Sequence, residues 1–162
     1  MQKHPIGKKL CDPLRWRDPR GIFVASVSDP FHPKLSDEEI AGSYGIMLLA
    51  KHHKFQQLTK RAKRMRQWYE WAGKLTIPDL IAYAAQLVEA KSPTPSADMK
   101  LLRRYDGMLG GYSWPLNNLW VGVSVEHQAA ADDRIPHLLG VPAAVHWISA
   151  EPLIGPIMLQ GD

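Results

Sequence analysis

The chain has 162 residues, of which 45% are hydrophobic, and its 20 Lys and Arg against 16 Asp and Glu leave a formal net charge of +4. This length suits one compact domain with its own core, and no apolar run approaches the roughly 20 residues of a membrane-spanning helix. The single cysteine, Cys11, excludes an internal disulfide. Together with an N-terminus that lacks the apolar core of a signal peptide, it predicts a cytoplasmic protein.

The first elements are an arm, a strand and a capped helix. Residues 1–20 hold three prolines and several cations, so we expect an irregular basic arm. Residues 22–28 are rich in β-branched side chains and free of charge, as in a parallel strand buried on both faces. Ser36 and Glu39 form the pattern of a capping box, which predicts a helix from there to about Ala50.

The same alternation continues to the end of the chain. We expect a second strand at 55–59 and a basic amphipathic helix from about Arg61 to Gly73. Residues 74–113 read as a helical insertion with a Pro-rich linker. Further strands at 119–125 and 144–149 flank a helix at about 128–139. Strands that alternate with helices predict an α/β fold with about four parallel strands, in a single domain of residues 1–162.

Polar side chains follow each predicted strand, where the carboxyl ends of parallel strands meet at one edge of the sheet. Nine residues are pocket candidates on this ground: Ser28, Asp29, His32, Lys60, Arg61, Ser124, Glu126, Ser149 and Glu151. For the first strand the alternative is that Asp29 caps a turn and His32 lies on the surface. We assign no catalytic residue, and the spacing of the histidines predicts no metal site.

A Ser-x-Glu element ends both the third and the fourth strand, at Ser124–Glu126 and Ser149–Glu151. Two neighbouring carboxylates at one rim can raise the pKa of one of them and form an acid–base pair. The same groups can instead bind an amine or ribose hydroxyls. A third reading is structural, with Glu126 at a helix start and Glu151 paired with a cation.

Charge is concentrated in the first part of the chain. Residues 1–66 carry 14 Lys and Arg against 6 Asp and Glu, a balance of +8, whereas residues 67–162 carry 6 against 10, a balance of −4. Such asymmetry indicates an anionic partner or simply a solvated basic face. Five cations in seven residues are the nucleic-acid-binding candidates, through contacts to phosphates: Lys60, Arg61, Lys63, Arg64 and Arg66.

Several segments together resemble a family of phage and prophage proteins, the phage gene-product thirty-seven/sixty-eight family, whose function is unassigned. They are Leu14–Trp16, Pro19–Arg20, Ile22–His32, Phe55–Arg61, Trp114–Glu126, Ala131–Pro136 and Ser149–Pro156. That family is similar to radical S-adenosylmethionine barrels. The resemblance implies that Ser28, Asp29, His32, Lys60, Arg61, Ser124, Glu126 and Glu151 line a barrel mouth, and that the protein is encoded by a phage or prophage and acts in the host cytoplasm.

The resemblance also implies parts that this sequence lacks. Family members carry a cysteine-rich stretch that ligates an iron–sulfur cluster, and they continue with further strands after the segment at Glu151. We therefore expect a partial, half βα-barrel without a cofactor of its own, because S-adenosylmethionine and the cluster follow only from the resemblance. Four strands leave two open sheet edges, which predicts an open sheet or self-association.

Three functions remain open from the sequence. The first is a cluster-less, radical-S-adenosylmethionine-like barrel fragment that keeps a ligand pocket at the strand ends and is not an independent redox enzyme. The alternative is a non-enzymatic phage protein that binds nucleic acid or a host nucleoprotein through the basic segment, such as an inhibitor of host defence. The third is an inert fragment of a disrupted gene.

Overall fold

The computed structural model describes residues 9–25, 28–106 and 113–159, and it is an α/β fold built on one open sheet. The sheet has four parallel strands in the order β1-β2-β3-β4. They are β1 (Gly21–Val24), β2 (Lys54–Thr59), β3 (Leu119–Ser124) and β4 (Val145–Ser149). The strands are parallel and neighbours in sequence are neighbours in space, as the strand–helix alternation predicts. This is the arrangement of the half βα-barrel that the family resemblance implies.

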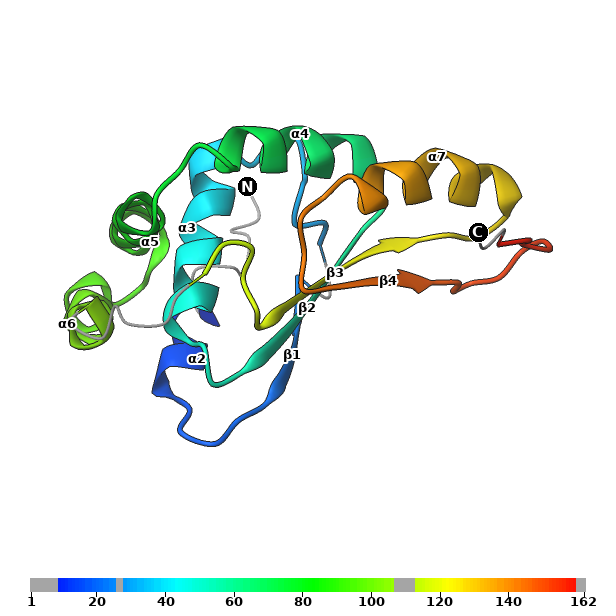
Figure 1. The fold of residues 1–162 in the computed structure, drawn as a ribbon. Coiled ribbons are helices and arrows are strands. Elements are labelled where there is room, and N and C mark those ends of the chain that lie inside the picture. The colour runs from blue at the N-terminus through cyan, green and yellow to red at the C-terminus, as the bar shows by residue number, and fades with distance from the viewer. Residues whose placement is uncertain (1–8, 26–27, 107–112, 160–162) are drawn as a thin grey trace.

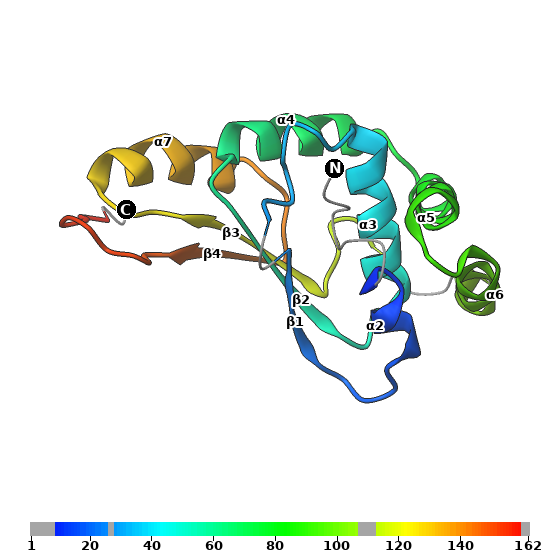
Figure 2. The ribbon, with the colours of Figure 1, turned by 180° about the vertical axis from the view of Figure 1, so that it is seen from behind.

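The helices lie on one side of the sheet. They include α3 (Asp37–Leu49), α4 (Ala62–Ala72) and α7 (Gln128–Leu139), with α5 (Ile77–Lys91) and α6 (Pro95–Asp106) beyond α3. Figure 1 shows α4 and α7 side by side above the strands, and Figure 2 shows the same arrangement from behind. The described residues hold no helix with the length and apolar character needed to cross a membrane.

Local signals in the sequence fix the helix starts. Ser36 caps α3, because its hydroxyl accepts the N–H of Glu39 at 3.2 Å while the Glu39 carboxylate accepts the N–H of Ser36 at 3.0 Å. Thr76 and Asp79 form a second capping box at the start of α5. These reciprocal bonds satisfy N–H groups that a helix start otherwise leaves unpaired.

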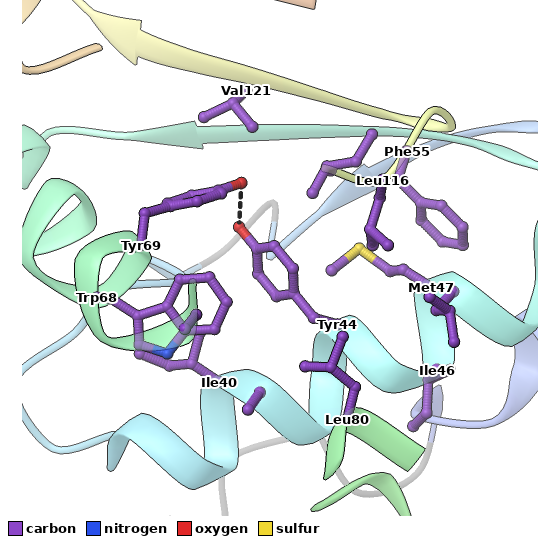
Figure 3. Packing of buried hydrophobic residues seen from close by; sticks show 14 of the residues in the cluster. Ile40, Tyr44, Ile46, Met47, Phe55, Trp68, Tyr69, Leu80, Leu116 and Val121 are labelled. Carbon is purple, nitrogen blue, oxygen red and sulfur yellow. Dashed lines mark hydrogen bonds between the residues drawn. The ribbon is translucent and has the colours of Figure 1, made fainter. Parts of the chain in front are cut away.

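The core lies between the sheet and α3, α4 and α5. Tyr44 and Trp68 are fully buried at its centre, with ring centroids 4.3 Å apart. The buried Tyr44 hydroxyl donates to Oε1 of Gln57 at 2.6 Å and accepts from the Tyr69 hydroxyl at 2.9 Å, and Figure 3 shows the bond between the two tyrosines amid apolar side chains. Trp68 is therefore a core residue, as its helical spacing from Met65 indicates.

Three boundaries differ from those expected. Strand β1 ends at Val24 rather than at residue 28, and Ala25 has a φ of 58°, which cannot continue a strand. The basic arm at 1–20 is not irregular throughout, because its described part contains helix α2 (Asp12–Arg15). The Pro-rich linker, which the sequence predicts over Ser92–Ser96, ends earlier, since α6 begins at Pro95, where a proline is tolerated in the first turn.

The two faces of the sheet differ in their surroundings. Ile22, Val24 and Ile148 pack against the buried core. The alternate residues share the other face through the strand register, and neither ribbon view shows a helix over it (Figures 1 and 2). We call this side the open face; its residues are Phe23, Gln56, Leu58, Trp120, Gly122, Val145 and Trp147.

Candidate functional site

The carboxyl ends of the strands surround a cavity of about 240 Å³. One part of its wall is apolar and comes from the open face and the β1 end. The other part consists of hydroxyl and charged groups that follow the strands. The lining residues are Phe23, Ala25, Ser28, Asp29, Leu58, Thr59, Lys60 and Ser124. The volume lies below the range of roughly 300–1,000 Å³ for drug-sized ligands, so the cavity suits a small ligand or part of one.

Asp29 organises the first part of this rim. Its Oδ1 accepts the N–H of Phe31 at 2.8 Å and the hydroxyl of Thr59 at 2.8 Å. Its Oδ2 accepts the N–H of Lys60 at 3.2 Å. Asp29 therefore closes its own turn, as the structural alternative predicts, and it also ties that turn to the end of β2.

Thr59 extends the same network to the start of α4. Its hydroxyl accepts the N–H of Arg61 at 2.9 Å while donating to Asp29. The Nε atom of Arg61 lies 3.9 Å from Oδ2 of Asp29, and both side chains are partly exposed. Arg61 thus faces the mouth, and its charge balances a carboxylate that already has three hydrogen-bond donors.

Glu126 organises the second part of the rim. It forms ion pairs with Lys60 of the β2 end and with Nη1 of Arg134, which lies 2.8 Å from its Oε2. Arg134 also donates from Nη1 to the Ser124 carbonyl at 2.6 Å. The hydrogen bond from Lys60, with help from the Arg134 charge, lowers the pKa of Glu126 despite burial. Glu126 is therefore ionised at neutral pH.

The two Ser-x-Glu elements lie in register but do not form an acid–base pair. Ser124 is directly opposite Ser149 across the β3–β4 ladder, so the strands place both elements at one edge. Among the described residues, no hydrogen bond or ion pair joins Glu126 to Glu151, which is exposed. The hydrogen bond from Lys60 and the Arg134 charge lower the pKa of Glu126 rather than raise it, so Glu126 is not a member of the pair with a raised pKa.

The nine pocket candidates divide into three groups. Ser28, Asp29, Lys60 and Ser124 line the cavity, and Arg61 and Glu126 form ion pairs with Asp29 and Lys60 of that wall. His32, Ser149 and Glu151 are absent from its wall. The Nδ1 atom of His32 accepts the N–H of Lys34 at 3.1 Å, which indicates a role in the local turn.

The basic run is largely neutralised within the chain. Lys60 and Arg61 pair with carboxylates of the rim. Arg64 donates to Asp37 at 2.5 Å and Arg66 to Glu70 at 3.2 Å. Lys63 is exposed and has no ion pair among the described residues. Four of these five cations therefore form ion pairs with carboxylates of the same chain.

Sequence reasoning missed five residues of the site: Ala25, Leu58 and Thr59 of the cavity wall, and Phe23 and Arg134. Arg134 is the last Lys or Arg of the chain and the first after Arg104, and that isolation was a signal that its charge has a specific partner. Phe23 sits within a strand that reads as buried on both sides, yet its side chain is 44% exposed at the cavity. The exposure of Phe23 follows from the absence of helices on one face of the sheet, and no pattern of neighbouring residues in the sequence predicts it.

The residues present do not fit an iron–sulfur cluster. Clusters in proteins are held mainly by several cysteine thiolates, and this sequence has one cysteine. Cys11 is buried in the core, and desolvation, with the negative charge of Asp98, raises its pKa to about 12. Within the described ranges, no three His, Cys, Asp or Glu side chains group in a way that could hold a metal ion.

Comparison with known proteins identifies one family. Residues 2–161 match a family described as "Protein of unknown function (DUF5131)". The search among curated proteins gives no match, and no solved structure matches either. The match covers nearly the whole chain, including the 74–113 insertion and every strand of the sheet.

Proposed function

Because the chain belongs to the DUF5131 family, whose function is unknown, we propose from the rim geometry that it is a binding protein for a small nucleoside-type ligand. The observation that carries the proposal is the cavity itself. Polar groups that follow three successive strands converge there beside an exposed aromatic ring. This is the position at which open parallel sheets bind ligands.

The two parts of the wall suit the two parts of a nucleoside. Phe23 and Leu58 offer an apolar surface on which a planar base can stack. Ser28, Ser124 and Lys60 offer hydroxyl and ammonium groups to sugar oxygens or to a carboxylate. S-adenosylmethionine, which the family resemblance suggests, combines all of these features and is the natural first probe.

The proposal is binding without redox chemistry of the chain's own. The donor set for a cluster is lacking in this sequence, as described above, and Glu126 is held as an anion between two cations. An ionised carboxylate can accept hydrogen bonds from an amine or a ribose hydroxyl, but it has no proton to donate. The rim therefore supports recognition better than acid–base catalysis.

Isothermal titration calorimetry tests the proposal. We expect the full chain to bind S-adenosylmethionine or adenosine with a stoichiometry of one ligand per chain. Lys60→Gln should weaken binding of the carboxylate-bearing ligand by about tenfold or more, because a hydrogen bond to a charged group contributes roughly 1.5–3 kcal/mol. Arg134 remains as a counterion for Glu126 in this variant, so the fold should persist.

The matched control is Lys63→Gln, three residues further along the chain in α4. It removes the same charge from an exposed position that does not line the cavity, so its affinity should equal that of the wild type. If both variants lost the same affinity, the loss would be an effect of net charge and not of the cavity wall. Absence of heat with every nucleoside tested, at concentrations up to the millimolar range, would refute the proposal.

Binding of nucleic acid is the alternative proposal, and one observation favours it: Lys63 projects from α4 without an ion pair among the described residues. The pairing of its four neighbours with carboxylates counts against it, since paired cations release fewer counterions on binding. Titration of single- and double-stranded DNA and RNA at two salt concentrations separates the proposals. Binding that weakens steeply with salt, and further with Lys63→Gln, would favour this alternative.

A further inference from the structure

The end of the sheet opposite the rim holds a second cavity, of about 220 Å³. It lies where α3 ends and where β2 and β3 begin, and its polar wall consists of Lys51, Lys54, Ser113, Asn117 and Asn118. In Figure 1 the turn from α3 into β2 lies at the lower end of the sheet, and α4, which follows β2, lies above it. A strand advances by about 3.3 Å per residue, so Lys54 of this wall and Thr59 of the rim lie roughly 17 Å apart.

The wall of this second cavity is fixed by the fold. Asn118 is 7% exposed, and its Nδ2 donates to the carbonyl of Met47 at 2.9 Å. That carbonyl belongs to the last turn of α3, where carbonyl groups lack a partner within the helix. The bond fastens the turn before β3 to the end of α3, above the buried Leu48 and Leu116. The Oδ1 atom of Asn118 accepts no hydrogen bond from the described residues, so the wall keeps an acceptor for a ligand.

The charge of the wall is positive. Lys51 and Lys54 are its charged residues, and the described wall holds no Asp or Glu. Arg20 lies at the same end, because its carbonyl accepts the N–H of Lys54 at 2.9 Å, and its guanidinium lies 4.6 Å from the ring centroid of Trp16. Both Lys54 and Arg20 are exposed and without an ion pair in the described ranges. One exposed acid, Asp18, lies in the segment that leads into β1.

This end of the sheet therefore differs from the rim in how its cations are used. At the rim Lys60 pairs with Glu126 and Arg61 with Asp29. At the opposite end the structure leaves Lys54 and Arg20 without such carboxylates. The anionic partner that the basic first part of the sequence indicates thus fits the second cavity better than the rim.

We propose that the second cavity binds the phosphate group of a sugar phosphate. A phosphate monoester carries a charge of about −1.5 to −2 near pH 7, which suits two ammonium groups better than a single carboxylate does. Lysine ammonium groups bind phosphate oxygens in many proteins. Oδ1 of Asn118 and the Ser113 hydroxyl can accept hydrogen bonds from sugar hydroxyls. The volume lies below the roughly 300–1,000 Å³ of drug-sized ligand sites, so it suits one phosphate with a few carbons.

Isothermal titration calorimetry of the full chain with ribose 5-phosphate tests the inference. We expect binding with a stoichiometry of one ligand per chain, which added salt weakens. Lys54→Gln should weaken binding by about tenfold, because it removes a hydrogen bond between charged groups. The Lys54 side chain is exposed, so the variant should fold as the wild type does, which circular dichroism can verify.

The matched control is Lys74→Gln. It removes the same charge from an exposed residue between α4 and α5 that lines neither cavity, so its affinity for ribose 5-phosphate should equal that of the wild type. The inference does not depend on the ligand proposed for the rim, because the two walls share no residue.

A phosphate monoester on a sugar also occurs at the 5′ end of a nucleic acid. A single-stranded oligonucleotide with and without a 5′-phosphate separates this source from the free sugar phosphate. Binding that requires the 5′-phosphate and weakens with Lys54→Gln would support the site and identify a nucleic-acid end as its ligand. The inference is wrong if neither phosphate gives heat up to the millimolar range, if Lys54→Gln and Lys74→Gln have the same affinity, or if Lys60→Gln abolishes binding and Lys54→Gln does not.

Discussion

Gly122→Ala is the sharpest test of how the open face packs. A Cβ atom built on Gly122 lies 2.6 Å from Cε2 of Trp147 and 2.7 Å from both Cδ2 and Nε1. Real Cβ atoms do not approach other atoms that closely. All three contacts belong to one rigid indole, so the ring cannot yield by a small rotation of a flexible end and must move as a unit.

The magnitude follows from two opposing effects. Overpacking costs about 1–3 kcal/mol, whereas replacement of a strand glycine by alanine gains roughly 0.5–1 kcal/mol from the unfolded chain. We therefore expect Gly122→Ala to destabilise the protein by about 0.5–2 kcal/mol. In a Trp147→Ala background the clash is absent, so the same substitution should be neutral or stabilise by up to about 1 kcal/mol.

Urea unfolding followed by circular dichroism measures all four proteins of this cycle at one protein concentration. A change of 1 kcal/mol corresponds to about 2–4 °C in Tm for a chain of this size, so thermal melts give a second reading. The reasoning fails if Gly122→Ala costs the same with and without Trp147. That outcome would place the indole elsewhere than over Gly122.

Three further predictions concern the fold and the rim. Burial lowers the pKa of His53, whose Nδ1 accepts the N–H of Arg20. As pH falls, the unfolded chain therefore binds a proton at this histidine before the folded chain does. Stability should therefore be full above about pH 6.5 and fall as pH drops through that value, and a Tm series should show a flatter profile for His53→Gln. Thr59→Val should cost about 1–3 kcal/mol in urea unfolding because it leaves the partly buried Asp29 carboxylate and the Arg61 N–H without this hydroxyl as a partner, whereas Thr59→Ser should recover most of the loss. Ser36→Ala should lower stability by about 0.5–2 kcal/mol through loss of the α3 cap, and a Tm unchanged within error would contradict that role.

Patterns within a few residues predicted the elements. The capping box at Ser36 placed the start of α3 to the residue, and helical spacing identified Trp68 as core. Alternation of strands and helices predicted the parallel sheet, because parallel strands need long crossover connections. The end of β1 was harder, since the left-handed conformation of Ala25 carries no sequence signal of the kind that glycine gives.

The site was predicted in position but not in detail. The meeting of Asp29, Lys60 and Ser124 follows from strand order alone. The pairing of Glu126 with Arg134 depends on the angle at which α7 leaves the sheet, and residue spacing does not encode that angle. The exposure of Phe23 depends on which sheet face the helices leave uncovered, which is a property of the whole topology.

The rim and the open face differ in how far the chain satisfies its own groups. Asp29 has three hydrogen-bond donors and Glu126 two cations, so a ligand at the rim must compete with bonds that already exist. On the open face Phe23 stays exposed and the Trp147 N–H lacks an acceptor among the described residues, so a partner there displaces only water. The chain's own groups therefore already satisfy the rim, whereas the open face keeps apolar surface in contact with water.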